Sequence, residues 1–321
     1  MNFLTTLAAG APEVQADKRI TDNNVFEWLF SRPMDAMSME LGSMDIAGRG
    51  VWFFYVASAI LLATGVLLLF IKKKELTDKW ITWASLAVLV GIPLWAGKLT
   101  TLPIVMILAS VAVWEFCRLV KLPKPERVLL HSLALGYPLA AYFSPDLLNL
   151  VPFFALVCAL PAVFQGDTER GIYRASMAMF GSIWICWSLS FLVVIWKDAF
   201  FVIFAVAAAD VGAWCGGKLL KRYGWARRGL SPLSPNKTIG GLVGGLVLSA
   251  LMMCLLGSIS VGLVLAIGLG SVAGDLLQSM VKRHAKVKDS GEWLPGFGGI
   301  LDRIDSWLLA FPLAATIGTF L

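Results

Sequence analysis

Charged and hydroxyl side chains alternate in one stretch of an otherwise apolar chain, between Gly270 and Ser306. On a helix, side chains three or four residues apart share one face, and the residues related in this way are Ser271, Asp275, Ser279, Lys282 and Lys286. Further on, Asp302 and Asp305 are three residues apart and flank Arg303. We expect this spacing to bring the carboxylates of Asp275, Asp302 and Asp305 together at the membrane surface.

Carboxylates without nearby histidine or cysteine favour Mg²⁺, which proteins typically hold through one or two carboxylates while substrate phosphates complete its coordination. Lysine and arginine beside such a centre neutralise phosphate charge, the main task of the protein in nucleotidyl transfer. Gly296, Gly298 and Gly299 would let the backbone approach a phosphate closely. The alternative is a basic amphipathic stretch that binds lipid headgroups, in which Asp302 and Asp305 begin a solvated helix. Residue types and spacing leave both interpretations open.

Further polar positions lie upstream of this stretch. Asp210 ends an apolar run, where an ionisable group is costly, and this favours a functional role over a side chain that merely reaches the interface. Lys237 and Thr238 precede a glycine-rich segment, as at a phosphate-binding helix N-terminus, although Ser234 and Thr238 would also serve as helix caps. We expect close helix packing at Gly240, Gly241, Gly244 and Gly245.

The stretch from Ser279 to Asp305 resembles the signature of the CDP-diacylglycerol synthase (phosphatidate cytidylyltransferase) family. The match is carried by Ser279-x-x-Lys282-Arg283-x4-Lys288-Asp289-x-Gly291-x-x-Leu294-Pro295-Gly296-x-Gly298-Gly299-x-x-Asp302-Arg303-x-Asp305. So many fixed positions make the pattern highly specific. Two further blocks resemble the family in the same order, Asp210-x-x-Ala213-Trp214-x-x-Gly217-Lys218 and Ser234-Pro235-x-Lys237-Thr238-x-x-Gly241. The resemblance covers the C-terminal third of the chain.

The resemblance implies an all-helical membrane enzyme with a cytoplasm-facing polar cavity, in a family whose members are often homodimers. It implies that CTP and phosphatidic acid, or a related lipid phosphate, react to give CDP-diacylglycerol and pyrophosphate in phospholipid biosynthesis. The family's metal positions correspond to Asp275, Asp302 and Asp305, which predicts a Mg²⁺ centre and leaves a second cation open. The predicted catalytic residues are these three with Lys282 and Arg283. The predicted substrate-binding residues are Asp210, Lys218, Ser234, Lys237, Thr238, Ser279, Lys288, Asp289, Gly298, Gly299 and Arg303.

Two positions depart from the family pattern. Phe297 stands where the family has histidine, and Gly240 stands where it has glutamate. Loss of an imidazole that would donate to phosphate predicts lower activity or a different lipid acceptor. The alternative is a non-catalytic paralogue that binds lipid or nucleotide. The three metal-type aspartates and the basic residues are all present, which favours an enzyme.

Lipid must be the solvent around most of the chain. Of its 321 residues, 58% are hydrophobic and 15% are charged, and the mean hydropathy of +0.77 is too high for a soluble domain. Apolar segments of membrane-spanning length recur, and we place ten of them at residues 51–71, 80–96, 101–117, 128–143, 147–165, 175–196, 199–215, 239–256, 258–274 and 307–321. Several are short or contain proline, so nine spans with one re-entrant or cytosolic helix are an alternative. We expect an all-α polytopic membrane protein of nine to ten transmembrane helices.

Basic residues indicate the orientation of these spans. The net charge is +6, and 21 lysines and arginines lie in the connections after odd-numbered segments, against two, Lys98 and Lys197, after even-numbered ones. By the positive-inside rule the odd connections face the cytoplasm, and we expect the active site on that face of a bacterial inner membrane. Topology and anionic headgroups account for the positive charge, so we expect no nucleic acid partner. In the third segment Glu115 is three residues before Arg118, which predicts an ion pair.

We expect three regions along the chain. Residues 1–50 form an N-terminal extension with an interfacial anchor near Phe26–Phe30, residues 51–200 the N-terminal transmembrane helices, and residues 201–321 the catalytic transmembrane region. The extension lacks a basic region followed by an apolar core, so we expect no cleaved signal peptide. The five cysteines are single residues in apolar segments, which indicates packing roles rather than a metal site.

Overall fold

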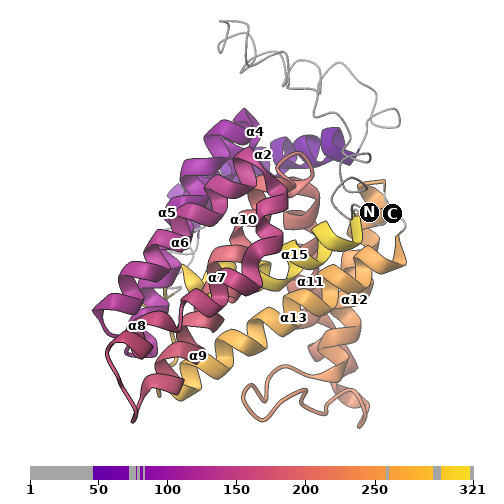
Figure 1. The fold of residues 1–321 in the computed structure, drawn as a ribbon. Helices are drawn as coiled ribbons and strands as arrows, with labels where there is room; N and C mark the ends of the chain where they lie inside the picture. The colour runs from indigo at the N-terminus through magenta and orange to yellow at the C-terminus, as the bar shows by residue number, and fades with distance from the viewer. Residues whose placement is uncertain are drawn as a thin grey trace, which may run out of the picture. The chain divides into compact units, whose positions relative to one another are not determined.

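The computed structural model of the protein describes residues 46–71, 77, 80–81, 84–257, 260–291 and 298–318 (Figure 1). They belong to a single unit, Asp45–Leu321. Every regular element in this part of the chain is helical, apart from one isolated antiparallel bridge. The predicted all-α class is therefore confirmed. The expected anchor near Phe26–Phe30, and also Gly296 and Phe297, lie outside the described residues.

The first half of the described chain forms helices that coincide with the first five predicted segments. In order, these are α2 (Ile46–Ile71), the π-helical turn η2 (Ala87–Gly91) followed by α4 (Ile92–Ala96), α5 (Lys98–Leu119), α6 (Lys124–Phe143), and the run of η3 (Pro145–Leu150), α7 (Val151–Val157) and α8 (Leu160–Phe164). Gly97 separates α4 from α5 with a φ of 135°, a conformation that glycine adopts without strain.

The second half coincides with the remaining five segments and carries the polar motifs. Its elements are α9 (Gly171–Gly181), the π-helical turn η4 (Ser182–Trp187), α10 (Ser188–Val194), α11 (Ala199–Leu219), η5 (Leu220–Arg222), α12 (Ile239–Leu255), α13 (Val261–His284), α14 (Leu301–Ile304) and α15 (Trp307–Gly318). α13 continues beyond the apolar segment into the polar stretch, so Asp275 and Lys282 lie on the helix itself.

Among the residues that the structure describes, six helices are long and apolar enough to cross a membrane: Gly48–Leu68, Lys98–Leu119, Pro145–Phe164, Gly171–Val194, Ala199–Arg222 and Val261–His284. Two shorter apolar helices are Ala84–Ala96 and Ile239–Leu255. Large apolar side chains on these helices are exposed, for example Leu62 to 69% and Phe153 to 63%. Exposure on this scale is unfavourable in water and suits contact with lipid. The protein is therefore an integral membrane protein.

Glycines bring α11 and α12 into backbone contact. A Cβ on Gly212 would overlap the carbonyl oxygen of Gly244, and a Cβ on Gly216 would overlap the carbonyl oxygen of Gly240. Small residues at such crossings let membrane helices approach closely, so the predicted packing role of the glycine-rich segment is confirmed. Asp210, on α11 beside this crossing, is thereby held near the loop that precedes α12.

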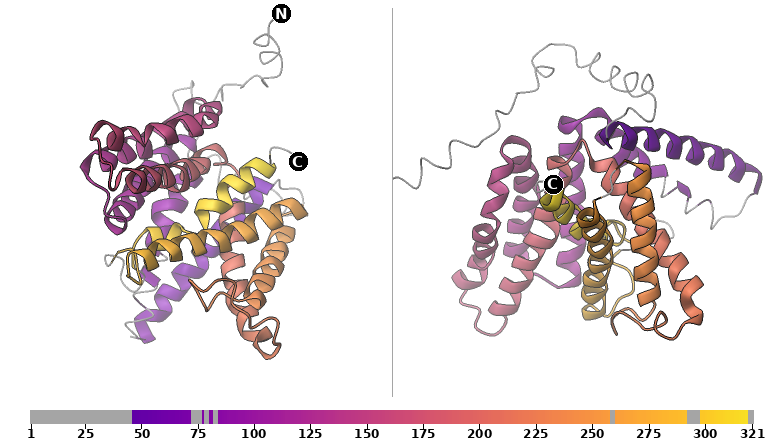
Figure 2. Two further views of the ribbon diagram at one scale, coloured as in Figure 1. Left: turned by 60° about the horizontal axis from the view of Figure 1, so that its bottom comes forward. Right: turned by 90° about the vertical axis from the view of Figure 1, so that its right-hand side faces the viewer.

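Helices α13 and α15 run side by side, as Figure 2 shows. A Cβ on Gly274 would overlap the carbonyl oxygen of Asp305, and a Cβ on Gly270 would lie 3.0 Å from Ala310 Cα. Because no side chain separates the two segments there, the turn between α14 and α15 lies directly against α13. This close approach places Asp305 beside the polar face of α13.

Several connections between helices meet at one end of the bundle. Tyr173 Oη donates to Val120 O at 3.2 Å and forms a hydrogen bond with His284 Nε2 at 3.0 Å. Tyr173, in the first turn of α9, thus joins the C-terminal ends of α5 and α13, beside three of the basic connections of the sequence. The start of α5 is joined to the end of α6 by Lys98 Nζ, which donates to Tyr142 O at 2.9 Å.

Candidate active site

Asp302 lies at the centre of a buried hydrogen-bond network. It is 7% exposed on α14, and its Oδ1 accepts from Lys282 Nζ at 2.7 Å and from Gln278 Nε2 at 3.3 Å, both on α13. Its Oδ2 accepts from the Ser290 N–H at 2.6 Å and the Gly299 N–H at 3.1 Å. Burial alone would raise the pKa of Asp302, but Lys282 and these N–H groups lower it below its ordinary value. Asp302 is therefore a carboxylate at neutral pH.

Asp305 and Asp210 form an acidic pair beside Asp302, and Ser306 bridges the two carboxylates. Asp305 is 7% exposed, and its Oδ1 accepts from the Ser306 N–H at 3.0 Å. Asp210 accepts from the hydroxyls of Ser271 at 2.8 Å and of Ser306 at 3.4 Å. Burial is the main cause that raises the pKa of Asp305 to about 7; the charge of Lys282 opposes the rise and that of Asp210 adds to it. Two adjacent carboxylates of this kind favour a nearby cation.

Lys237 reaches α13 from the loop before α12 and forms an ion pair with Asp275. Burial lowers the pKa of Lys237, because removal from water disfavours its charged form. The next residue, Thr238, caps α12, with its Oγ1 accepting from the Gly241 N–H at 3.1 Å. This confirms the capping interpretation for Thr238, whereas Ser234 lies in a turn outside the helix, where its carbonyl accepts from the Lys237 N–H at 3.0 Å.

The two upstream motifs meet in a pocket of about 200 Å³. Asp210 and Trp214 line it from α11, and Lys237 and Thr238 line it from the loop before α12. The predicted substrate residues of separate motifs are therefore neighbours. Lys218 stacks instead on Trp214, with its Nζ 3.7 Å from the ring centroid, a cation–π contact.

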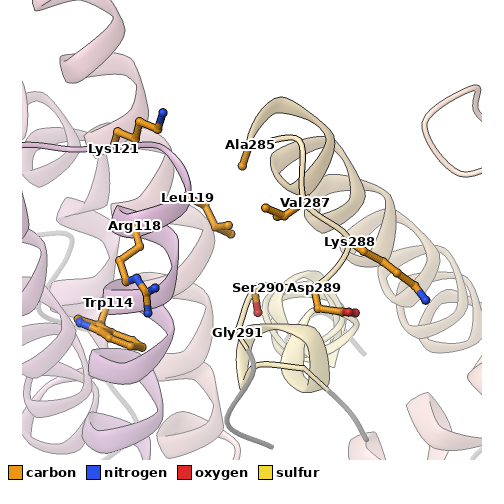
Figure 3. Close-up of a pocket in the computed structure, with 10 residues that line it drawn as sticks. All are labelled: Trp114, Arg118, Leu119, Lys121, Ala285, Val287, Lys288, Asp289, Ser290 and Gly291. Atoms are coloured by element: carbon orange, nitrogen blue, oxygen red, sulfur yellow. The ribbon is translucent and has the colours of Figure 1, made fainter.

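A larger pocket of about 860 Å³ lies between the end of α5 and the loop after α13 (Figure 3). Trp114, Arg118 and Lys121 line it from α5 and the turn that follows, and Lys288 and Asp289 line it from the loop. The described lining residues thus carry three cations and one carboxylate, a balance that suits a phosphate group. The Arg118 guanidinium lies 4.6 Å from the centroid of the Trp114 ring, which orients it.

Arg118 and Lys121 were not among the predicted site residues. Both residues lie at the basic end of α5, and the positive-inside rule already accounts for their charge. Nothing in the local sequence therefore indicated that this end of α5 faces the loop after α13, which contains Lys288 and Asp289. The predicted ion pair between Glu115 and Arg118 is wrong. Arg118 lies over Trp114, and Glu115 instead contacts the start of α14, where its Oε1 accepts from the Ile300 N–H at 2.9 Å.

Four of the five residues of the predicted polar stripe lie on α13, at the spacing that places them on one face. Ser271, Asp275 and Lys282 make the three contacts described above. Ser279 is half-buried on the same helix. Lys286 is not part of the stripe, because α13 ends two residues before it.

Two lysines follow helix ends in the left-handed backbone region. Lys121 has a φ of 54° after α5, and Lys286 has a φ of 58° after α13. Glycine usually occupies this position of a helix C-terminal turn, and a residue with a Cβ costs roughly 1–2 kcal/mol there. Both turns thus place an ammonium group at a helix C-terminus, where the helix dipole favours a cation.

The glycines of the signature turn leave no space for a side chain. Gly298 has a φ of 78°, and a Cβ on it would lie 2.7 Å from Asp302 Oδ2. A Cβ on Gly299 would overlap Ser290 Oγ and the carboxylate of Glu115. Both glycines therefore allow the backbone to reach carboxylates of the protein itself, a role that the prediction of phosphate contact did not include.

The remaining predicted residues lie around this core. Arg283 is exposed and donates to a carbonyl oxygen four residues further on, at 3.3 Å, and Arg303 is half-buried on α14. A Cβ on Gly240 would lie 3.1 Å from Ala226 Cβ, so the glutamate that the family pattern has at this position would fit only after a shift of the backbone. Phe297 lies outside the described residues.

The four aspartates fall into two classes with respect to a metal ion. Asp275 and Asp302 each bind a lysine, whereas Asp210 and Asp305 form no ion pair with any described residue. In the part of the chain that the structure describes, no group of three or more histidine, cysteine, aspartate or glutamate side chains is arranged to hold a metal ion. Oxygen donors of this kind fit Mg²⁺, which needs only one or two protein carboxylates when phosphate and water supply its other ligands.

Comparison with known proteins identifies the family of this chain. A sequence profile of the Cytidylyltransferase family matches residues 77–321 of the chain. The chain is 32% identical to the phosphatidate cytidylyltransferase of Helicobacter pylori (strain J99), over 72% of this chain and 87% of that protein. It is 32% identical to the phosphatidate cytidylyltransferase of Pseudomonas aeruginosa, over 65% and 83%, and 29% identical to the uncharacterized protein YnbB of Escherichia coli (strain K12), over 75% and 87%. Because the profile spans both pockets and all four aspartates, the chain belongs to the cytidylyltransferase family and is a nucleotidyltransferase.

Proposed function

We propose that this nucleotidyltransferase transfers the cytidylyl group of CTP to the phosphate of phosphatidic acid, or of a related lipid phosphate, in phospholipid biosynthesis. The products are CDP-diacylglycerol, or the corresponding CDP-lipid, and pyrophosphate. The family and the two relatives named phosphatidate cytidylyltransferase support this reaction. The observation that carries it is the presence of two lysine–aspartate ion pairs, Lys237–Asp275 and Lys282–Asp302, beside two polar pockets.

The reaction needs charge neutralisation and positioning more than proton transfer. An oxygen of the lipid phosphate forms a bond to the α-phosphorus of CTP, the bond from that phosphorus to the β-phosphate oxygen breaks, and pyrophosphate leaves. The attacking oxygen is already anionic, so no general base is needed. Lys237 and Lys282 suit this chemistry, because each can exchange its carboxylate partner for a phosphate oxygen and neutralise the charge that develops.

The same exchange provides for a divalent cation. If both lysines bound phosphate oxygens, Asp275 and Asp302 would lose their lysine partners, and their carboxylates together with that of Asp305 would be available to hold Mg²⁺. These three aspartates are the proposed metal-binding residues, and the additional carboxylate of Asp210 is compatible with a second cation. When bound, Mg²⁺ would neutralise charge on the triphosphate and on the leaving pyrophosphate.

The larger pocket would supply the remaining positive charge. Ser290 forms part of the pocket wall, and its N–H and hydroxyl donate to Asp302 Oδ2 at 2.6 and 2.9 Å. A phosphate bound by Arg118, Lys121 and Lys288 would therefore be separated from the Lys282–Asp302 pair by a single residue. This proximity supports the larger pocket as a substrate site.

The proposal includes the orientation of the enzyme. All ten predicted segments fall on a helix or on consecutive helices, which supports ten spans. The connections after the odd-numbered segments hold most of the lysine and arginine, and Tyr173 lies beside three of them at one end. By the positive-inside rule this end, with the active site, would face the cytoplasm of a bacterial inner membrane. A homodimer, which the family resemblance implies, stays a prediction.

An activity screen tests the reaction. Purified protein is given Mg²⁺, CTP labelled at its α-phosphate, and either phosphatidic acid, lysophosphatidic acid or a polyprenyl phosphate in mixed micelles. The expected result is pyrophosphate release together with a labelled CDP-lipid for at least one acceptor. Several acceptors are compared because Phe297 and Gly240 depart from the family pattern. Binding of CTP without turnover of any acceptor would contradict the proposal.

A further inference from the structure

We propose that Glu115, which lies on α5 outside every signature motif, is a positioning residue for the active site. Its carboxylate holds the start of α14 and Ser290 so that Asp302 is presented to Lys282. The catalytic consequence rests on the proposed cytidylyl transfer. The structural part of the inference depends on geometry alone.

Glu115 is 0% exposed although it lies in a membrane-spanning helix. Its Oε1 accepts from the Ile300 N–H at 2.9 Å, and its Oε2 accepts from the Leu301 N–H at 2.8 Å and from Ser290 Oγ at 2.8 Å. The first N–H groups of a helix have no partner within the helix, and here a residue 185 positions earlier provides the acceptor. A buried ionisable group in a membrane is costly, and by default it indicates a function.

Ser290 links Glu115 to Asp302. Its hydroxyl oxygen lies 2.8 Å from Glu115 Oε2 and 2.9 Å from Asp302 Oδ2, and its N–H donates to Asp302 Oδ2 at 2.6 Å. A hydroxyl has a single proton, so it donates to one carboxylate at a time and keeps both oxygens close to it. Displacement of Glu115 would therefore move Ser290 and, with it, two of the donors that orient Asp302.

The packing around Glu115 leaves little room for another arrangement. A Cβ on Gly299 would overlap both carboxylate oxygens of Glu115 and also Ser290 Oγ, and the Gly299 N–H donates to Asp302 Oδ2 at 3.1 Å. Glu115 is not among the described residues that line the two pockets, so we infer that it acts on the site through Asp302. Arg118, one helical turn further along α5, lines the larger pocket. The same end of α5 therefore holds Ser290 and the start of α14 through Glu115 and also forms the cationic wall of the pocket.

The test compares Glu115→Gln with a matched control, Glu126→Gln. The amide keeps the size of the side chain but replaces one acceptor oxygen with a donor that would face N–H or O–H donors. Glu126 is also 0% exposed, but it binds Arg174, whose Nε donates to it at 2.8 Å, and no hydrogen bond or ion pair among the described residues joins it to α14. Hydrogen exchange of the peptide 298–306 is measured by mass spectrometry, together with kcat, KM for CTP and the Mg²⁺ concentration for half-maximal activity.

For Glu115→Gln we expect faster exchange at the amides of Ile300 and Leu301, a kcat about 10- to 100-fold lower, and a higher Mg²⁺ requirement. For Glu126→Gln we expect wild-type exchange in this peptide and a wild-type Mg²⁺ requirement, even where its Tm falls. Equal losses in both variants would show general destabilisation and overturn the inference.

Two other results for Glu115→Gln would also overturn the inference. One is wild-type hydrogen exchange in the peptide 298–306, and the other is faster exchange in that peptide together with a wild-type kcat and Mg²⁺ requirement. If Glu115→Gln does not fold, Ser290→Ala removes only the hydroxyl link, and wild-type exchange and kcat in that variant count against the inference. If the wild-type protein forms no CDP-lipid from any lipid phosphate, the proposed function fails. The exchange comparison between Glu115→Gln and Glu126→Gln then still decides whether Glu115 holds the loop.

Discussion

Two kinds of aspartate meet in this site, and their partners distinguish them. Asp275 and Asp302 are each neutralised by a lysine, so both are charged and occupied before substrate arrives. Asp210 and Asp305 have only hydroxyl or N–H partners, and burial raises the pKa of Asp305 to about 7. A polyanionic substrate that carries a cation would provide partners for both kinds of aspartate. Its phosphates would bind the lysines of the paired aspartates, and its cation would bind the carboxylates.

Replacement of Asp305 by asparagine tests this view of the site. Asn can still accept the hydrogen bond from the Ser306 N–H, so we expect a Tm close to that of the wild type. Loss of the carboxylate removes charge that a divalent cation needs, and we expect kcat to fall by about 10²- to 10³-fold, as for loss of one electrostatic contact to the transition state. Asp146→Asn, at an exposed position of η3, is the control for both measurements. A kcat for Asp305→Asn within a factor of two of the control would contradict the proposed role.

Motif spacing selected charged residues that are neighbours in the structure, such as Asp275, Lys282 and Asp302, but it did not predict how they pair. Asp275 and Lys237 are 38 residues apart, and Glu115 and Ile300 are 185 apart, so no local rule encodes either contact. The rule for helical neighbours assigned Glu115 to Arg118, which is the partner that an isolated helix would provide. In the folded chain, unpartnered N–H groups at the start of α14 compete successfully for the same carboxylate.

Among the elements, the crossing of α11 and α12 depends on the absence of side chains. Gly212→Ala would place a methyl group against the carbonyl oxygen of Gly244, and overpacking of this kind costs about 1–3 kcal/mol. We expect a lower Tm in detergent. Gly136→Ala on α6 is the matched control, because no atom lies within 4 Å of the added Cβ and alanine is the better helix former by up to about 1 kcal/mol. Equal changes of Tm in the two variants would argue against a tight crossing.

The connection between α8 and α9 should respond to pH. Asp167 accepts from Arg174 Nη1 at 2.7 Å and from the Arg170 N–H at 2.8 Å, and the bond from Arg174 is the main cause that lowers the pKa of Asp167. A lowered folded-state pKa stabilises the protein above the unfolded-state value of about 3.9, and this contribution is lost as the pH falls through the folded-state pKa. Wild type should therefore have a higher Tm than Asp167→Asn at pH 7. The difference should shrink below about pH 4, and a constant difference would be evidence against the ion pair.

For the molecule as a whole, the proposed orientation makes opposite predictions for two exposed lysines. Lys221, on η5, would face the cytoplasm, and Lys197, between α10 and α11, would face the other side. In a background without native cysteines, Lys221→Cys and Lys197→Cys are treated with a membrane-impermeant maleimide. In right-side-out vesicles we expect labelling of Lys197→Cys alone, and in inverted vesicles of Lys221→Cys alone. Labelling of both variants from one side would show that the ten-span alternation is wrong.

Hydropathy was a good guide to the helices of this protein because lipid leaves few alternatives. A backbone in hydrocarbon must satisfy its hydrogen bonds within the segment, so each apolar segment became a helix. Hydropathy did not predict which helices meet, because apolar side chains pack against lipid and protein with similar energy. The crossings depend on particular small residues, such as Gly212 and Gly274, and on buried polar contacts between distant parts of the chain.

Where Gly212 meets Gly244 and Gly216 meets Gly240, no side chain lies between the backbones of α11 and α12, so rotamer changes there cannot let these helices slide past each other. We therefore expect Asp210 on α11 and Lys237 before α12 to move together. Widening of the site would then take place between this pair of helices and α13, where the contacts are Lys237 with Asp275 and Ser271 with Asp210. Phosphate and water can replace such polar contacts, so we expect binding of a substrate phosphate to be coupled to opening of the site, on the microsecond-to-millisecond timescale typical of helix movements.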